Sequence, residues 1–206
     1  NIDLLFKKTK TILLKNSPIL DITSAINELN FVKEIHVVAI NNDVKELLYM
    51  LEKGYCKEIL IKTINFTKNN AQKFHFNYHK KPVSSYHEPL EYLYEPNAAV
   101  LKSGAFHEIS TQLNIFKLHQ HSHLYTSKKR IEFPGREFKI VAVLPYDKKQ
   151  ILKLLPNKKA NITIRNFHKT VAQIRKELKI KDGGDSFLFF TTKIHNKFIC
   201  MYCKKL

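Results

Sequence analysis

The sequence predicts two folded parts of different class, an α/β part up to about residue 80 and an α+β part after it. Short apolar runs alternate with helix-type patterns in the first part, and a polar, Pro-containing stretch follows at residues 78–85. The charge changes near the same place. Residues 1–66 hold 9 Lys and Arg against 8 Asp and Glu, whereas residues 67–206 hold 26 against 10.

The first part is predicted to be a mostly parallel sheet of the β-α-β-α-β type with one further strand at its edge. Asp21 is suited to cap a helix over residues 22–29. Asp43 and Glu46 have the spacing of a capping box, which predicts a helix over residues 44–53. Strands are expected at 11–14, 35–40, 58–64 and 73–78. The second of these is continuously apolar, so we place it inside the sheet and expect cover on both of its faces.

The second part is predicted to mix short helices and strands. Pro134-Gly135 is expected to form a turn, and Thr170 with Gln173 has the spacing of a capping box. Helices are expected at 90–94, 98–102, 106–113, 148–155 and 171–180. Strands are expected at 116–118, 124–126, 138–144, 160–164, 186–192 and 198–202. From residue 138 onward the order is β-α-β-α-β-β, which is typical of ferredoxin-like modules.

The composition excludes several classes of protein. No apolar run approaches the roughly 20 residues that a membrane span needs, and the first residues lack the zones of a signal peptide. Three cysteines are too few for a disulfide scaffold, so we expect a cytoplasmic protein. Because the chain opens without Met inside a helical pattern, we interpret it as a fragment of a longer protein.

The formal net charge of +17 is the strongest compositional signal. A surface this basic is suited to nucleic acid, to an anionic membrane surface or to an acidic protein. A merely soluble, lysine-rich surface is the alternative without a partner.

Four stretches resemble a known family. They are YEPNAAVLKSGAF at residues 94–106, RNF at 165–167, KIKDGGDSFLF at 179–189 and LKNSPILDI at 14–22. Together they are similar to the carboxy-terminal region of bacterial, Bacteroidetes-type class I methyltransferases that depend on S-adenosylmethionine and end in a THUMP-like domain. The resemblance covers nearly the whole chain. One departure is His168, which stands where the family more often has Pro.

The resemblance implies three regions. Residues 1–80 would be the carboxy-terminal half of a Rossmann-like methyltransferase sheet, residues 81–136 a helical and ferredoxin-like connector, and residues 137–206 the THUMP-like domain. THUMP modules bind RNA, usually tRNA, and deliver it to an attached catalytic domain. The expected partner is therefore RNA, either tRNA or rRNA, and no membrane is expected. The oligomeric state stays open.

The cofactor-binding start of the methyltransferase fold is missing from the sequence. A nucleoside cofactor at the end of a Rossmann-like sheet needs a Gly-rich turn after the first strand of a βαβ unit. None of the five glycines stands in such a position. We therefore expect no catalytic residue, no cofactor-binding residue and no metal in this chain, with S-adenosylmethionine bound only by the full-length protein.

The basic residues of the terminal module are the predicted RNA-binding site. Arg175, Lys176 and Lys179 fall on one flank of the predicted helix 171–180. Gly183 and Gly184 could form a backbone nest for a phosphate. A tight helix-to-strand connection is the favoured interpretation, and the two interpretations are compatible. The predicted set is Lys158, Lys159, Arg165, Lys169, Arg175, Lys176, Lys179, Lys181, Gly183 and Gly184.

Three other patterns were weighed as sites and given less weight. His119, His121 and His123 alternate, but no acidic residue or cysteine near them completes a metal site. Cys200 and Cys203 are interpreted as buried small residues, since positions three apart on a strand face opposite sides. The aromatic run 187–190 is interpreted as a core strand and not as a surface on which bases stack.

Three functions remain open from the sequence. The chain could be the substrate-binding end of an RNA methyltransferase that is inactive alone. It could be a stand-alone RNA-binding module without catalysis. It could also be a protein-interaction scaffold whose charge is directed at an acidic partner.

Overall fold

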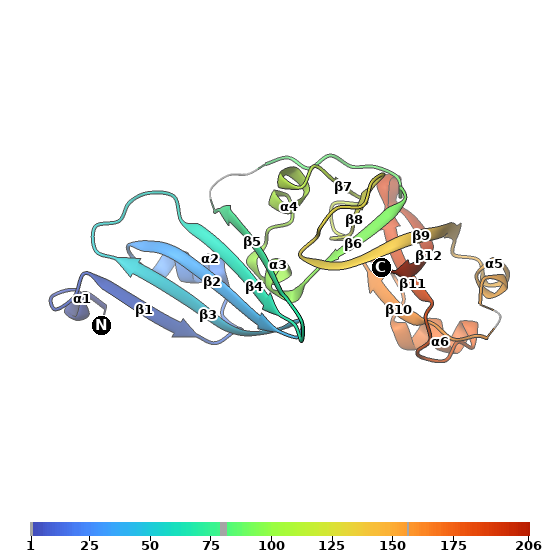
Figure 1. Cartoon of the computed structure of the whole chain (residues 1–206), viewed down its shortest axis with the longest axis horizontal. Coiled ribbons are helices and arrows are strands. Elements are labelled where there is room, and N and C mark those ends of the chain that lie inside the picture. Colours follow the sequence, from blue (N-terminus) through green and yellow to red (C-terminus); the bar gives the residue numbers. More distant parts are fainter. Residues whose placement is uncertain (1, 79–81, 156) are drawn as a thin grey trace. The chain divides into compact units, whose positions relative to one another are not determined.

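The computed structural model describes residues 2–78, 82–155 and 157–206, which form two compact units (Figure 1). The first unit contains the chain up to Pro82 together with Asn97–Ile109, and the second contains Val83–Pro96 and Ser110–Leu206. Helix α3 (Ala98–Ser103) therefore belongs to the first unit although strand β6 (Tyr92–Pro96), just before it, belongs to the second. None of the described helices is long and apolar enough to cross a membrane.

The first unit is built on a five-stranded sheet with the order β1-β3-β2-β4-β5. Its elements are α1 (Ile2–Leu5), β1 (Thr11–Asn16), α2 (Ile22–Glu28), β2 (Val32–Ile40), β3 (Asp43–Glu52), β4 (Leu60–Phe66) and β5 (Ala71–Asn77). Asp21 caps α2 by accepting a hydrogen bond of 2.8 Å from the Ser24 backbone N–H, as predicted. This bond is the main reason why the pKa of the Asp21 carboxyl lies below its usual value.

Strand β2 lies inside the sheet between β3 and β4, which confirms its predicted central position. Its side chains alternate, so that Ile35, Val37 and Ala39 are fully buried while His36 and Val38 are half-buried. Helix α3 packs against β2, β3 and β4. The expectation of cover on both faces is wrong, because alternation of this kind belongs to a strand with only one fully buried face.

The predicted helix 44–53 is wrong, since these residues form strand β3. Asn41 and Asn42 both have positive φ, 50° and 66°, which makes a tight turn after β2. The chain therefore returns antiparallel to β2, and Leu47, Tyr49 and Leu51 alternate inward. Of the four strand pairings only β2 with β4 is parallel, so the prediction of a mostly parallel sheet is wrong as well.

The second unit is built on a seven-stranded sheet with the order β10-β11-β12-β9-β6-β8-β7. Helix α4 (Glu108–Gln112) spans the point in the sequence where the first unit ends and the second resumes. The remaining elements are β7 (Phe116–Lys117), β8 (Tyr125–Ser127), β9 (Gly135–Pro145), α5 (Lys148–Lys153), β10 (Asn161–Arg165), α6 (Val171–Leu178), β11 (Phe187–Lys193), the 3₁₀ turn Ile194–Asn196 and β12 (Lys197–Lys205). The predicted order β-α-β-α-β-β from residue 138 onward is confirmed, as is the capping box of Thr170 and Gln173.

Two local predictions fail in the second unit. No helix forms at 90–94, and residues 92–94 instead open β6, which pairs with β8 on one side and with β9 on the other. Its side chains are almost all buried there, and Tyr94 places its hydroxyl 3.0 Å from the Ser127 hydroxyl. Gly135 is not in a turn but opens β9 opposite Pro96. In both cases strand pairing with distant residues outweighs a local pattern.

The sheet of the second unit has a hydrophobic core on each face. One core is formed by α5, α6 and the side chains of Leu188, Phe190 and Cys200. The other contains Leu93, Leu118, Leu124, Phe138, Phe189, Met201 and Cys203. The two thiols therefore lie on opposite faces, which confirms their interpretation as buried small residues. Burial raises the pKa of both thiols. Phe189 and Phe190 are fully buried, as expected of a core strand.

Gly135 is predicted to be intolerant of any side chain. A Cβ atom at this position would lie 2.1 Å from the carbonyl oxygen of Glu95 and 2.9 Å from the Phe133 ring. We expect Gly135→Ala to lower the free energy of unfolding by about 2 kcal/mol, because β6 and β9 must move apart. Gly104→Ala, where φ is +75° and no atom lies within 4 Å, should cost only about 1 kcal/mol of backbone strain. Denaturant unfolding of both variants checks this, and equal losses would contradict it.

Candidate nucleic-acid interface

The ten residues predicted to bind RNA all lie on β10, on α6 or on the segments that flank them. The structure divides the cations among them into two groups. Arg165, Lys169 and Arg175 are held by carboxylates. Among the residues that the structure describes, no carboxylate pairs with Lys158, Lys159, Lys176, Lys179 or Lys181.

Arg165 is part of an ion-pair cluster around the buried carboxylate of Glu95, and this cluster joins three strands. Its Nε and Nη2 donate to Oε1 of Glu95 at 3.1 and 2.8 Å. Arg136 donates to the other oxygen of the same carboxylate, through Nε at 2.7 Å and through Nη2. The Glu95 side chain is only 4% exposed, whereas the two arginine side chains are 37% and 41% exposed. The ion-pair cluster therefore connects β10 and β9 to β6, and Arg165 has a structural role that the sequence did not indicate.

Lys169 and Arg175 are engaged on the surface of the module. Lys169 donates to Glu177 at 2.6 Å, and the Tyr146 hydroxyl donates to the same carboxylate at 2.9 Å. These two bonds hold the pKa of the Glu177 carboxyl below its usual value, and the bond to Glu177 raises the pKa of Lys169. Arg175 is paired with Asp182. Both cations are thus partly neutralised by neighbours.

The five remaining lysines form what we call the lysine cluster: Lys158, Lys159, Lys176, Lys179 and Lys181. Backbone hydrogen bonds bring its parts together, because the Lys181 N–H donates to the Lys158 carbonyl at 2.8 Å and Lys159 is bridged to Lys181. Lys179 ends α6 in the left-handed conformation, with Lys176 one turn before it. All five are exposed, and in the described parts of the chain none of them forms an ion pair.

Gly183 and Gly184 follow the lysine cluster with φ of +92° and +79°, so both positions favour glycine. The Gly184 carbonyl accepts a hydrogen bond of 2.7 Å from the Asn161 amide. This ties the segment to the start of β10, as a tight helix-to-strand connection requires. A hollow of about 280 Å³ adjoins it, lined among others by Lys159, Gly184 and Asp185.

One cation of this hollow was missed from the sequence. Lys204, near the end of β12, lines it together with Tyr202, and its Nζ lies 5.5 Å from the centre of the Tyr202 ring. The hydrogen bond with Ser186 is the main cause that lowers the pKa of the Tyr202 hydroxyl, and Lys204 adds to it. The only signal in the sequence was the alternation of these two residues on a strand whose position beside β11 was not known.

Comparison with known proteins agrees with this architecture. Residues 135–205 match the model of a THUMP domain-like family, and residues 92–134 match that of a ferredoxin-like domain. Among solved structures, the crystal structure of a "putative methyltransferase" from Porphyromonas gingivalis W83 superposes with a TM-score of 0.87 at 33% sequence identity. The chain is a methyltransferase-related protein with a THUMP-like domain.

The match to the P. gingivalis protein covers 95% of this chain but only 51% of that one. The chain thus spans about half the length of this relative. The comparison with curated proteins gives no match. The lysine cluster, its hollow and the two glycines all fall within the THUMP-like domain, and Glu95 falls within the ferredoxin-like one. The ion-pair cluster therefore ties β6 of the ferredoxin-like domain to β9 and β10 of the THUMP-like domain within one continuous sheet.

The histidines weighed as metal ligands have other contacts. His119 lies in a connection before β8, and its Nδ1 accepts a hydrogen bond from the Asn166 amide at 3.1 Å. Its Nε2 is then the protonated nitrogen and donates to Asn196 Oδ1 at 2.9 Å. Within the residues that the structure describes, no group of three His, Cys, Asp or Glu side chains is arranged to hold a metal ion.

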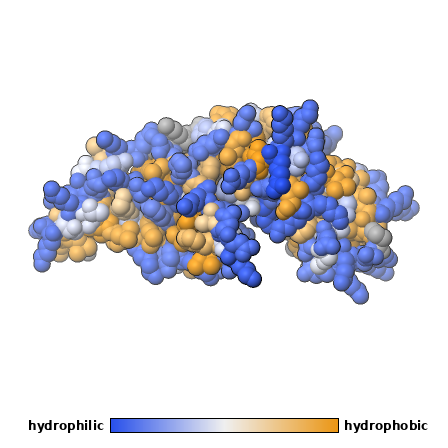
Figure 2. Space-filling view, viewed as in Figure 1, coloured by the Kyte–Doolittle hydropathy of each residue, from blue (hydrophilic) through white to orange (hydrophobic). Residues whose placement is uncertain are grey.

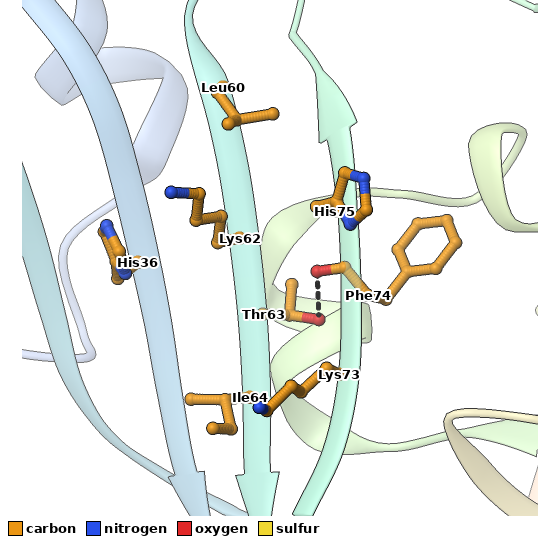
Figure 3. A pocket seen from close by; sticks show the side chains of 8 residues that line it. All are labelled: His36, Leu60, Lys62, Thr63, Ile64, Lys73, Phe74 and His75. Atoms are coloured by element: carbon orange, nitrogen blue, oxygen red, sulfur yellow. Dashed lines mark hydrogen bonds between the residues drawn. The ribbon is translucent and has the colours of Figure 1, made fainter.

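A second hollow lies in the first unit, on the sheet face that bears His36, and encloses about 360 Å³ (Figure 3). His36, Lys62 and His75 are register neighbours across β2, β4 and β5. The Glu34 carboxylate accepts bonds from Lys62 at 2.8 Å and from His36 at 2.9 Å. The bond from Lys62 is the main reason why the pKa of Glu34 is lowered. Because this carboxylate offsets the positive charge, the hollow is less suited to an anion than the lysine cluster is.

The exposed surface of the first unit is mixed in character. Hydrophobic residues reach the surface over the five-stranded sheet, among hydrophilic ones that dominate the face shown (Figure 2). Leu13, Ile40 and Phe66 are examples of large apolar side chains exposed in this unit. Scattered apolar exposure of this kind is ordinary for a folded protein.

Proposed function

We propose that the chain is the RNA-binding, carboxy-terminal part of an S-adenosylmethionine-dependent RNA methyltransferase and that it is inactive alone. The lysine cluster of the THUMP-like domain carries this proposal. Five exposed ammonium groups without carboxylate partners among the described residues are available to phosphates. The relation to the P. gingivalis protein supports the methyltransferase part, and the THUMP-like family supports RNA, either tRNA or rRNA, as the partner.

The arrangement of the first sheet supports the link to a methyltransferase. Strands β1 and β2 both run antiparallel to β3, which lies between them, so β1 and β2 are parallel to each other and α2 connects them. This is a β-α-β unit with one antiparallel strand inserted, a motif that suits the α/β sheet expected of a Rossmann-like fold. We propose that this unit is the carboxy-terminal half of such a sheet.

The residues present do not fit the cofactor. After β1, the turn of the β-α-β unit reads Ser17-Pro18-Ile19-Leu20-Asp21, without glycine. A Gly-free turn does not let the backbone approach a nucleoside as closely as this fold requires. Gly54 is in the first unit but follows β3, and Gly104 ends α3. The cofactor site of the proposed enzyme would therefore lie in residues outside this chain.

The chain is expected to show no binding of S-adenosylmethionine. Isothermal titration of the chain with the cofactor should give only the heat of dilution, because the glycine turn is missing. Micromolar binding would contradict the placement of the chain within the methyltransferase. The same titration with the proposed longer enzyme is the positive control.

Binding to RNA tests the main proposal. Fluorescence anisotropy with labelled tRNA and rRNA fragments should give affinities that fall steeply as salt is raised, since counterions are released from phosphates. An acidic protein of similar charge density is the competing ligand. Equal affinity for this protein would favour an interaction scaffold, and a salt-independent interaction with RNA would contradict the proposal.

A further inference from the structure

A group of aromatic rings comes to the surface on the THUMP-like domain, at the connection between β10 and α6. Phe167 and His168 of this connection meet Phe198 at the start of β12, and we call these three residues the aromatic platform. The ring centre of His168 lies 4.5 Å from that of Phe167 and 4.5 Å from that of Phe198. Phe167 lies 5.3 Å from Phe198, edge to face. Residues 30 positions apart in the sequence thus form one continuous aromatic surface.

The platform is fixed from below. Phe167 packs on the buried Phe190 at 5.6 Å, and Tyr146 packs on both at 5.5 and 5.7 Å. The connection itself is fastened to β11, where the Thr191 hydroxyl donates to the Arg165 carbonyl at 2.7 Å and the Thr192 hydroxyl donates to the Asn166 carbonyl. The rings are therefore preorganised, and a ligand that stacks on them need not order them first.

The top of the platform is open to solvent. The Phe198 side chain is 45% exposed, and His168 is exposed as well. A hollow of about 400 Å³ opens here, lined by Ile164, Asn166 and the platform. Apolar ring surface that stays in contact with water is unfavourable, and contiguous exposed rings often mark a binding site. The fixed, exposed rings of His168 and Phe198 are therefore suited to a ligand that stacks on them.

The surroundings of the platform favour a base of nucleic acid over an apolar peptide. Lys197, next to Phe198, is exposed and has no ion pair within the described residues. Lys169 also lies beside the platform, with its Nζ 4.4 Å from the centre of the Tyr146 ring, but it is already bonded to Glu177. Asn166, in the same hollow, donates through Nδ2 to His119, and its amide oxygen can accept a hydrogen bond from a base edge. Rings that stack, a cation for phosphate and an amide for a base edge are the groups that bind single-stranded RNA.

We propose that an unpaired base of single-stranded RNA stacks on the exposed faces of His168 and Phe198. This inference rests on the proposed RNA-binding function and specifies its substrate class, namely RNA with an unpaired stretch. The lysine cluster would supply affinity for the phosphate backbone of any RNA. The aromatic platform would add a preference for bases that are free to leave their stack.

The test compares two ligands and three variants by anisotropy. The ligands are a 12-nucleotide single-stranded RNA and the same sugar-phosphate chain without bases. Phe198→Leu and His168→Leu remove a ring and keep an apolar side chain. Phe66→Leu is the matched control, because Phe66 is also 45% exposed but lies on β4 of the first unit. Thermal unfolding confirms that each variant is folded.

We expect each platform variant to bind the RNA about tenfold more weakly than the wild type does, from the loss of one stacking contact. The same variants should bind the baseless chain as the wild type does, and Phe66→Leu should change nothing. A 2-aminopurine base in the RNA should be quenched by the wild type and less by Phe198→Leu.

Three results would overturn the inference. If the wild type binds RNA but the platform variants bind it equally well, RNA binding stands and the stacking site does not. If a mononucleotide or a proline-rich peptide binds as tightly as the 12-nucleotide RNA, and Phe198→Leu abolishes this binding, the platform serves another ligand. If the wild type binds no RNA even at low salt, the inference fails together with the proposed function.

Discussion

Replacing Glu95 by Ala is expected to lower the free energy of unfolding of the second unit by about 3 kcal/mol. The buried carboxylate receives bonds from Arg136 and Arg165 and connects three strands through them. Without it, two guanidinium groups stay close together and lose their partner. Removing one partner of a buried ion pair costs about 3–5 kcal/mol. We expect the lower end, since both arginines are more than a third exposed and water can hydrate them.

Denaturant unfolding followed by circular dichroism measures this loss. Glu91→Ala is the control, because Glu91 sits just before the same strand but pairs with Lys139 on the surface. Its removal should change the stability little. Glu95→Gln should lie between the two, since the amide oxygen can still accept from one arginine. Similar stabilities of Glu95→Ala and Glu91→Ala would show that the ion-pair cluster does not hold the strands together.

Replacing all five residues of the lysine cluster by Ala is expected to weaken the binding of single-stranded RNA by about three orders of magnitude at roughly 0.1 M salt. Each phosphate contact contributes about 0.7 to the slope of log K against log salt. If each lysine contacts one phosphate, five lost contacts should flatten the slope by about 3.5. The fold should persist, because none of the five has an ion pair to lose among the described residues.

The matched control removes five lysines from the first unit. Lys7, Lys8, Lys10, Lys57 and Lys68 are exposed, and they too lack ion pairs within the described residues. Because both variants lose five charges, only the position of the charges differs. We expect the control to keep nearly all of the affinity. Equal losses in the two variants would show that RNA responds to net charge alone and that the THUMP-like domain has no special share.

This choice of residues differs from the one that the sequence alone suggested. Arg165 and Arg175 belong to the predicted RNA-binding set, and they stay in it as predictions. Their guanidinium groups, however, point at Glu95 and Asp182. Replacing them would mix a change of stability with a change of binding, whereas the lysine cluster separates the two.

The sequence by itself determined the features that depend on neighbouring residues and on total composition. These are the concentration of positive charge after residue 66, the caps at Asp21 and Thr170, and the order of elements in the terminal module. It also determined the relation to methyltransferases with a THUMP-like domain, which the quoted strings carried. A cap or a helix stripe acts over a few residues, so its signal is present in the chain itself.

Only the tertiary structure decided how distant segments meet. It turned the predicted helix 44–53 into β3, because pairing with β1 and β2 on both edges outweighs a capping signal. It also determined which cations are paired with carboxylates. Arg165, for example, pairs with Glu95, which lies 70 positions away in the sequence. It also assembled the aromatic platform from the connection between β10 and α6 and the start of β12. Strand pairing, ion pairing and ring stacking depend on separation in space, and the local sequence does not contain that separation.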